Sequence, residues 1–260
     1  ILYIPALLCL LFAWVMQIDS NFVNDYFDFK RGNDDETRLG PKRACAEGWI
    51  TERAMKTSII VTTLLGCAIG LPLVIYGGMA MIWVGVACVA FCFLYTTTFS
   101  YHGMGDILVL LFFGIVPVCC TYYVIMPEGY KTVSTEVVMA AIACGLVVDT
   151  LLVVNNFRDR DNDREAGKRT SVVVFGRKLA ALAYLVNGLL AMSVLGVVWM
   201  RLYFASAWWF VLPMLAYLLL HIATWRKLTH TTGAALNPLL GATARNMLIF
   251  TILLCAILLI

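Results

Sequence analysis

The chain has 260 residues, of which 62% are hydrophobic and only 13% are charged, and its formal net charge is +3. Because soluble domains carry about 25% charged residues, this composition excludes a disordered chain, a disulfide-stabilised secreted domain and an ordinary soluble domain. No polar stretch is long enough for a separate soluble domain. We therefore expect one membrane-embedded domain over residues 1–260 and no nucleic-acid partner.

Apolar runs divide the chain into eight expected membrane spans, since a transmembrane helix needs about 20 mainly apolar residues. The 49-residue uncharged run 57–105 is split by Gly77 and Gly78. In chain order the expected spans are 1–19, 55–76, 79–98, 106–126, 136–155, 179–200, 206–224 and 242–260. Open strands cannot satisfy their backbone hydrogen bonds in lipid, so the predicted fold class is an all-α polytopic membrane helix bundle. The chain begins at Ile1 inside an apolar run, and we expect further sequence before it.

Lysine and arginine residues are strongly biased toward one side of this bundle. If the eight spans alternate, 17 of the 19 lysine and arginine residues lie on the side of the segments 20–54 and 156–178. The opposite side receives only Lys131 and Arg201. By the positive-inside rule, we expect these two segments to be cytoplasmic loops of a multi-pass plasma (inner) membrane protein.

Two acidic motifs begin where expected spans end. Asn24-x3-Asp28 recurs as Asn155-x3-Asp159-x3-Asp163, at an offset of 131 residues, on the same side of the membrane. Residues four apart share one helix face, so each motif forms a stripe of oxygen ligands. Carboxylate and amide oxygens without thiol or imidazole partners indicate a hard cation. Mg²⁺ typically takes one or two carboxylates and completes its shell with water and phosphate oxygens, and it is the expected metal.

Basic side chains follow both acidic motifs and could hold the same phosphates. These nearby cations are Lys30, Arg31, Arg38, Lys42, Arg43, Arg158, Arg164, Lys168 and Arg169. Arginine binds phosphate with a bidentate fork and lysine as a point charge. Acidic and basic groups at the mouth of an apolar bundle suggest an amphiphile with a diphosphate head and a tail among the helices. The alternative is a pair of solvated loops whose charges only fix the topology.

The two motifs resemble a known family. The residues 24–28, NDYFD, and 155–163, NNFRDRDND, are similar to the two Asp-rich motifs of the UbiA superfamily of intramembrane prenyltransferases. Further matches indicate its 1,4-dihydroxy-2-naphthoate polyprenyltransferase subfamily: residues 24–32, 38–41, 101–106, 166–170, 236–238 and 243–245. The chain departs from the superfamily pattern at Gly32, where the first motif usually has a third Asp, which leaves Asp34 or Asp35 as its substitute. Asn155 stands where many relatives have Asp, and the family's bundle has one helix more than the eight expected spans.

The resemblance implies a reaction and roles for particular residues. Mg²⁺ would bridge the diphosphate of a polyprenyl diphosphate donor, basic residues would neutralise the leaving diphosphate, and 1,4-dihydroxy-2-naphthoate would attack the allylic cation and lose its carboxylate. The product would be demethylmenaquinol, an intermediate of menaquinone biosynthesis. The implied metal-site residues are Asn24, Asp28, Asn155, Asp159 and Asp163, and the implied diphosphate-binding residues are Arg158, Lys168, Arg169, Lys42 and Arg43.

Two further carboxylates lie in or beside apolar spans. A carboxylate at membrane depth is costly and usually functional, so Asp149 is expected to face the substrate cavity, with a polar packing partner as the alternative. Asp106 is expected to orient the aromatic acceptor, as a fourth catalytic carboxylate beside Asp28, Asp159 and Asp163. Its alternative role is a charge partner for a helix N-terminus.

Other functions remain open at this point. A sister prenyltransferase would use 4-hydroxybenzoate, homogentisate or a chlorophyll precursor as acceptor. A transporter would place its site near the midplane, often with inverted repeats, whereas the acidic motifs here form a parallel repeat at one face. A membrane phosphatase acting on polyprenyl diphosphate would need the charged segments but no aromatic acceptor.

Overall fold

The structure of the chain is a computed structural model that describes residues 1–33, 38–203 and 208–259. Asp34 and Asp35, the candidate substitutes for a third motif acid, lie outside the described residues, as do residues 206–207 and 260 of the last two expected spans. Within the described part, eight helical segments are long and apolar enough to cross a membrane. The protein is therefore a multi-pass membrane protein with an all-helical fold, as its composition predicts.

In the described residues the eight spans contain ten α-helices, because the second and fourth spans are each divided into shorter helices. In chain order they are α1 (Tyr3–Lys30), α2 (Glu52–Gly70) with α3 (Leu73–Gly77), α4 (Ala80–Thr97), α5 (Gly105–Val109) with the π-helix η2 (Leu110–Cys120) and α6 (Thr121–Ile125), α7 (Thr135–Glu165), α8 (Ser171–Tyr203), α9 (Val211–His230) and α10 (Asn237–Leu259). Short 3₁₀ turns connect some of them: η1 (Phe99–His102), η3 (Trp208–Phe210) and η4 (Gly233–Leu236). As expected, Gly77 and Gly78 separate the second and third spans.

The helices that carry the acidic motifs are longer than the apolar runs predict. α1 continues to Lys30 and α7 to Glu165, so the first ten or so residues of the expected loops 20–54 and 156–178 are helical. Charged residues end an apolar run, but they do not break a helix. Each helix instead ends just before a glycine with a positive φ, at Gly32 (φ 72°) and Gly167 (φ 74°). Gly32 therefore lies beyond the stripe on which a third motif acid would stand.

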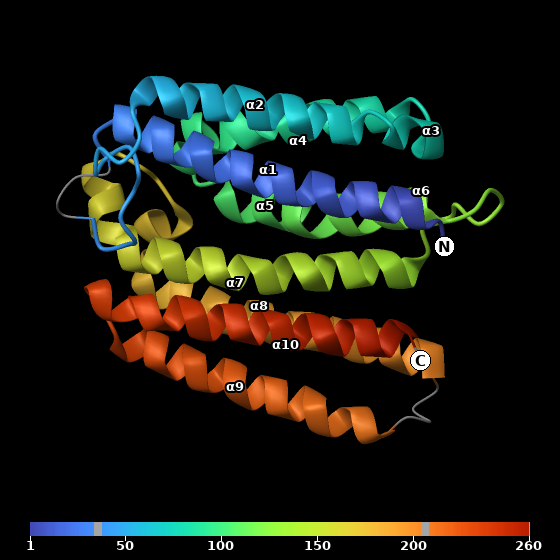
Figure 1. The fold of residues 1–260 in the computed structure, drawn as a ribbon. Helices are drawn as coiled ribbons and strands as arrows, with labels where there is room; N and C mark the ends of the chain where they lie inside the picture. The colour runs from blue at the N-terminus through green and yellow to red at the C-terminus, as the bar shows by residue number, and fades with distance from the viewer. Residues whose placement is uncertain (34–37, 204–207, 260) are drawn as a thin grey trace.

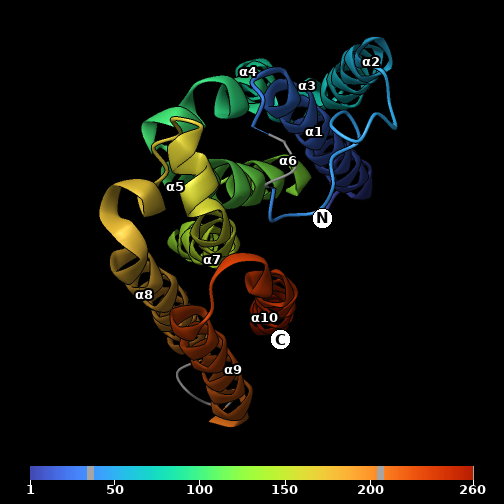
Figure 2. The ribbon, with the colours of Figure 1, turned by 90° about the vertical axis from the view of Figure 1, so that its left-hand side faces the viewer.

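α7 is the central helix of the bundle. In Figure 2 the bundle is viewed along the helix axes, with α1, α2 and α4 on one side of α7 and α8 and α9 on the other. α7 packs against η2, α8 and α10, while α1 packs against α2 and α4. α7 and η2 meet at Gly114 and Gly145, where a Cβ on Gly114 would lie 2.6 Å from the Ala141 carbonyl oxygen. Small residues thus allow the two backbones to touch, as is common between membrane helices.

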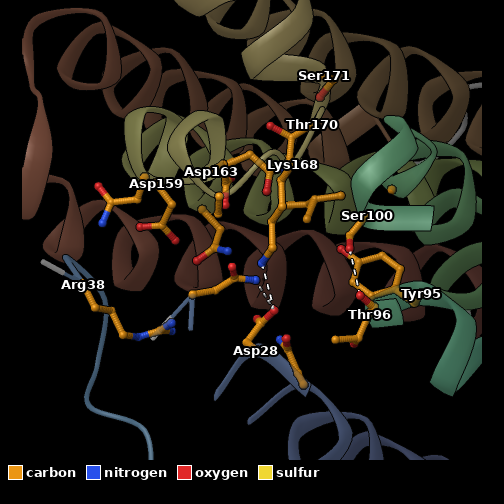
Figure 3. A pocket seen from close by; sticks show the side chains of 18 of the residues that line it. Asp28, Arg38, Tyr95, Thr96, Ser100, Asp159, Asp163, Lys168, Thr170 and Ser171 are labelled. Atoms are coloured by element: carbon orange, nitrogen blue, oxygen red, sulfur yellow. Dashed lines mark hydrogen bonds and ion pairs between the residues drawn. The ribbon is translucent and has the colours of Figure 1, made fainter. Parts of the chain in front are cut away.

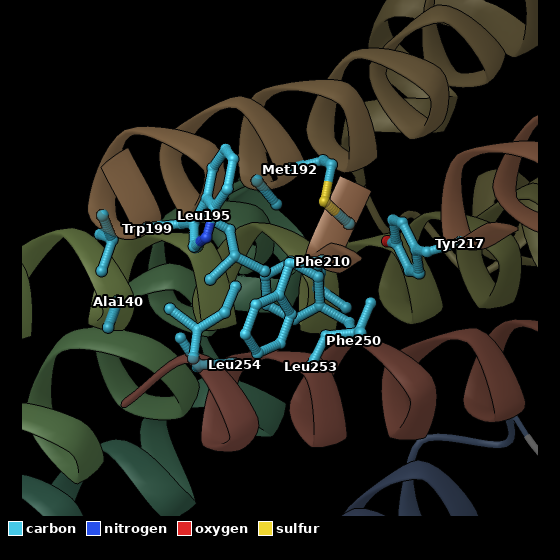
Figure 4. Packing of buried hydrophobic residues seen from close by; sticks show 14 residues of the cluster. Ala140, Met192, Leu195, Trp199, Phe210, Tyr217, Phe250, Leu253 and Leu254 are labelled. Carbon is cyan, nitrogen blue, oxygen red and sulfur yellow. The ribbon is translucent and has the colours of Figure 1, made fainter. Parts of the chain in front are cut away.

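A large apolar core joins the four C-terminal helices. Figure 4 shows its side chains between α7, α8, α9 and α10, with Leu195, Trp199, Phe210 and Phe250 among them. Lipid supplies no hydrophobic force between helices, so this interdigitated packing provides much of their association. The core leaves the charged ends of α1 and α7, at the left of Figure 1, at one end of the bundle together with the start of α8.

Candidate active site

Both acidic motifs line one cavity at the charged end of the bundle (Figure 3). Asn24 and Asp28 stand on the last turns of α1, while Asn155, Asp159 and Asp163 stand on the last turns of α7. Because these ends are helical, residues four apart share one face, and the two stripes meet across the cavity. The cavity contains about 880 Å³ of empty space, including the part open to solvent. All five predicted oxygen ligands therefore surround one space.

Asp28 is a buried carboxylate held by three neighbouring side chains. Lys168 Nζ lies 3.0 Å from Asp28 Oδ1, and Asn33 Nδ2 donates to the same oxygen at 3.1 Å. With its NH₂ turned toward Asp28, the Asn24 amide donates to Oδ2 at 2.7 Å and accepts from Arg43 at 3.2 Å. Asp28 thus links the end of α1 to the connection before α8 and to the segment that carries Arg43.

Lys168 lies in the turn between α7 and α8 and points into the cavity (Figure 3). Its ammonium group is 5.7 Å from the centre of the Tyr101 ring, and the Tyr101 hydroxyl accepts a hydrogen bond from Asn33 at 2.5 Å. Burial disfavours the ammonium charge, but the carboxylates of Asp28 and Asp163 outweigh it, so the pKa of Lys168 lies above its ordinary value. Lys168 is therefore a fixed positive charge beside two acidic residues.

Arg158 does not line the cavity, although the resemblance implies that it binds diphosphate. Its side chain is among the largest fully buried ones of the described chain. Nε and Nη2 lie 2.7 Å and 2.6 Å from the two carboxylate oxygens of Asp159. The guanidinium is thus held by protein groups and does not belong to the cavity lining.

The other predicted basic residues divide into two groups. Arg43 lines the cavity, whereas Lys42 and Arg169 are exposed and lie outside its lining. Lys42 pairs with Glu47 at 2.6 Å instead. Arg38, one of the nearby cations that could hold phosphate but without a role implied by the resemblance, lines the cavity on the same side as Asp159 (Figure 3).

The side of the cavity opposite Asp159 is formed by the end of α4 and the turn after it. Figure 3 shows Tyr95, Thr96 and Ser100 there, across from Arg38 and Asp159. Asp106, at the start of α5, also lines the cavity, and its Oδ1 accepts a hydrogen bond from Ser171 at 3.1 Å. This wall therefore offers hydroxyl groups and one carboxylate rather than a cluster of charges.

Asp149 was expected to face the cavity, but it is buried and does not belong to the cavity lining. Its Oδ2 accepts a hydrogen bond from Asn187 Nδ2 at 2.7 Å, between α7 and α8, and its Oδ1 has no hydrogen-bond partner among the described residues. The polar neighbour considered as an alternative from the sequence is thus present, while a role in substrate binding stays a prediction.

Several polar residues of the cavity were not found from the sequence: Asn33, Tyr95, Ser100, Asn156, Asn162, Thr170 and Ser171. Asn162 follows Asn155 and Asp159 at helical spacing, so the periodicity of the motif could have identified it. Tyr95 and Ser100 carry no such signal, because the end of α4 and the turn after it bring them to the cavity from a distant part of the sequence.

The donor set fits a hard cation that also binds phosphate. Among the described residues, no three His, Cys, Asp or Glu side chains are close enough to form a complete metal cluster. Mg²⁺ seldom needs such a cluster, since it takes one or two carboxylates and completes its shell with water and phosphate oxygens. Asp28, Asp159 and Asp163, with amide oxygens and the cations Lys168, Arg38 and Arg43 around the same cavity, match that requirement.

Comparisons with known proteins place this chain in a family. Residues 3–242 match the model of the UbiA prenyltransferase family. A 1,4-dihydroxy-2-naphthoate octaprenyltransferase of Escherichia coli (strain K12) is 37% identical over 185 residues, covering 66% of this chain and 57% of that protein. One of Mycobacterium tuberculosis (strain ATCC 25618 / H37Rv) is 34% identical over 250 residues, covering 95% and 82%.

A solved structure of digeranylgeranylglyceryl phosphate synthase shares the fold, with a TM-score of 0.60 at 17% identity over 99% of this chain and 85% of that one. The aligned part of the chain spans little more than half the length of the Escherichia coli relative and of a Haemophilus influenzae relative with the same name.

Proposed function

The chain belongs to the UbiA prenyltransferase family, and we propose that it transfers a polyprenyl group from polyprenyl diphosphate to 1,4-dihydroxy-2-naphthoate in a Mg²⁺-dependent reaction that releases CO₂. The observation that carries this proposal is the meeting of the two acidic stripes around a cavity that also holds Lys168. The similarity to proteins named 1,4-dihydroxy-2-naphthoate octaprenyltransferase supports the choice of acceptor.

In this proposal the donor's diphosphate lies between α1 and α7. When bound, Mg²⁺ would supply the positive charge that offsets the charge of the leaving diphosphate. The oxygens of Asp28, Asp159 and Asp163 would hold that ion, assisted by the amides of Asn24 and Asn155. Lys168 would donate to a diphosphate oxygen, and Arg38 and Arg43 would approach it from the opposite segment. Fixed charges of this kind stabilise a leaving group without reorganising during the reaction.

The allylic C1–O bond breaks, and its electron pair leaves with the diphosphate. The ring carbon that bears the carboxylate then forms a bond to the allylic carbon. The carboxylate leaves as CO₂, and the electron pair of the broken C–C bond returns to the ring, which restores aromaticity and gives demethylmenaquinol. We assign the wall of Tyr95, Ser100 and Asp106 to the acceptor, because its hydroxyl groups and carboxylate can pair with phenolic hydroxyl groups. A dry bundle interior would protect the allylic cation from water.

We further propose that the site end of the bundle faces the cytoplasm of a cell with a plasma (inner) membrane. The charge bias supports this orientation, because the ends of α1, α7 and α9 and the starts of α2, α8 and α10 carry most of the lysine and arginine residues. A water-soluble naphthoate could then enter from the cytoplasm, while the prenyl tail remains in the bilayer.

The test uses purified protein in lipid with Mg²⁺, labelled polyprenyl diphosphate and either 1,4-dihydroxy-2-naphthoate or 4-hydroxybenzoate, with EDTA as the control. We expect mass spectrometry to detect a decarboxylated prenyl-naphthoquinol only with Mg²⁺. If prenylated hydroxybenzoate is the only product, the acceptor is 4-hydroxybenzoate rather than the naphthoate. Free prenol and phosphate with neither acceptor modified would indicate a phosphatase, and product formation in EDTA would contradict the metal requirement.

A further inference from the structure

The Arg158 guanidinium is surrounded by four hydrogen bonds to protein groups. Two go to Asp159, at 2.7 Å and 2.6 Å, one goes to Asn155 Oδ1 at 2.8 Å, and one goes to Asn237 Oδ1 at 3.1 Å. Asp159 and Asn155 line the cavity, whereas Arg158 and Asn237 do not. The arginine therefore contacts two proposed metal-site residues without being part of the cavity lining itself.

Asn237 extends this contact to a distant segment. It stands at the start of α10, and its Nδ2 donates to the Leu39 carbonyl oxygen at 2.9 Å, across 198 residues of sequence. Leu39 belongs to the segment 38–43, whose Arg38 and Arg43 line the cavity. One buried arginine thus joins the acidic stripe of α7, the start of α10 and the segment that brings two cations to the site.

Gly40 provides independent geometric support for this arrangement. A Cβ at Gly40 would lie 2.7 Å from Arg158 Nη2 and 3.1 Å from its Cζ. The guanidinium cannot move aside freely, because its hydrogen bonds to Asp159, Asn155 and Asn237 would be lost. The segment 38–43 therefore lies directly on the guanidinium, and a Cβ at position 40 would have to displace it.

We propose that Arg158 is a positioning residue: it orients Asp159 and Asn155 toward the cavity and, through Asn237, fixes the segment 38–43 over the site. The inference rests on the proposed function in so far as Asp159 and Asn155 bind the metal. Outer partners that orient metal ligands typically contribute about 10- to 100-fold in metal affinity or activity. Substitution of such a residue should change the Mg²⁺ concentration that the reaction needs more than it changes the affinity for the donor.

The test compares Arg158→Lys, which keeps the charge but loses the planar fork, with Asn237→Ala, which removes the bridge to Leu39. For both variants we expect faster hydrogen–deuterium exchange of residues 38–43, measured without metal or substrate. For Arg158→Lys we also expect the half-saturating Mg²⁺ concentration to rise about 10- to 100-fold, while the KM for the donor at saturating Mg²⁺ changes less than about threefold.

A third variant, Gly40→Ala, places a methyl group against the guanidinium and should reproduce part of the Arg158→Lys effect. Its matched control is Gly241→Ala, because a Cβ on Gly241 in α10 meets nothing within 4 Å. In the Arg158→Lys background, Gly40→Ala should add little, since the fork that it displaces is already gone.

A higher donor KM with unchanged Mg²⁺ dependence and unchanged exchange would overturn the inference and make Arg158 a diphosphate ligand. The inference would also be overturned if Arg158→Lys left the exchange of residues 38–43, the half-saturating Mg²⁺ concentration and the donor KM all unchanged. If the unmodified protein shows no prenyl transfer, the proposed function fails, but hydrogen–deuterium exchange still tests the positioning role of Arg158. Faster exchange of residues 38–43 in both variants supports that role, and unchanged exchange rejects it.

Discussion

Among single residues, Asp159 should be the most sensitive to substitution. The change Asp159→Asn preserves its size but removes the charge that faces both the cavity and Arg158. Since even outer partners of metal ligands are worth about 10- to 100-fold, we expect prenyl transfer to fall by about 100-fold or more. The measurement is the initial rate of product formation, with thermal stability in detergent recorded to confirm folding.

Asp161 is the matched control for that substitution. It stands two residues further along α7, and its carboxylate pairs with Arg160 and Arg177, both at 2.9 Å, rather than lining the cavity. We expect Asp161→Asn to retain activity within about twofold, because exposed ion pairs contribute little. Near-normal activity of Asp159→Asn would remove Asp159 from the site.

Lys168 should determine donor binding more than acceptor binding. Hydrogen bonds to charged groups contribute about 1.5–3 kcal/mol, which corresponds to about a 10- to 100-fold change in an equilibrium constant. We therefore expect Lys168→Ala to raise the KM for polyprenyl diphosphate by about that factor and to leave the KM for the naphthoate nearly unchanged. Steady-state kinetics with each substrate varied in turn provide the measurement.

The comparison for Lys168→Ala is Lys178→Ala, which removes a lysine of α8 outside the cavity lining. An effect of Lys168→Ala that is confined to the acceptor would contradict its assignment to the diphosphate. Equal effects of the two variants on donor binding would indicate that only the net charge of this end matters.

Among the elements, the packing of α8 on α9 should depend on Gly188. A Cβ at this position would lie 2.2 Å from His221 Nε2, and the His221 ring is itself stacked on Tyr184 with the ring centres 4.8 Å apart. Overpacking of a buried site typically costs about 1–3 kcal/mol. We expect Gly188→Ala to lower the free energy of unfolding by about that amount, as seen in a lower midpoint of thermal unfolding in detergent.

The control for this element is Gly85→Ala in α4, where an added Cβ meets nothing within 4 Å. Alanine is the better helix former by about 1 kcal/mol, so this variant should be neutral or stabilising. If Gly188→Ala is equally harmless, then α8 and α9 are not held at the distance that the structure gives.

The spans could be predicted from the sequence because apolar composition alone determines which segments can enter lipid. α1 and α7 continue beyond those spans because no helix breaker occurs before Gly32 and Gly167. A hydropathy pattern does not show where a helix breaker stands, so it cannot predict these helix ends. The spacing of the acidic motifs predicted which of their residues line the cavity. The burial of Arg158 could not be predicted, because it depends on Asn237 and Gly40, whose contacts arise only in the folded chain.

In the whole molecule, the two ends of the bundle differ in composition. One end carries the cavity and most of the cations, while the described residues of the other end include Lys131, whose ammonium donates to the Tyr76 carbonyl and pairs with Glu128. This lysine satisfies a carbonyl at the end of α3, so its role is local. The bias therefore gives the molecule an electrical polarity that should set its orientation in the membrane.

That orientation can be measured with two single cysteines in a variant whose nine native cysteines are replaced. Lys42 lies at the site end with 68% of its side chain exposed, and Glu128 lies at the other end with 87% exposed. In sealed right-side-out vesicles, a membrane-impermeant thiol reagent should label Glu128→Cys and spare Lys42→Cys until the vesicles are opened. The reverse labelling pattern would place the cavity outside the cell and would contradict the orientation expected from the positive-inside rule. Labelling of both positions before opening would mean either leaky vesicles, which a cytoplasmic marker protein detects, or a mixed orientation that the charge bias does not allow.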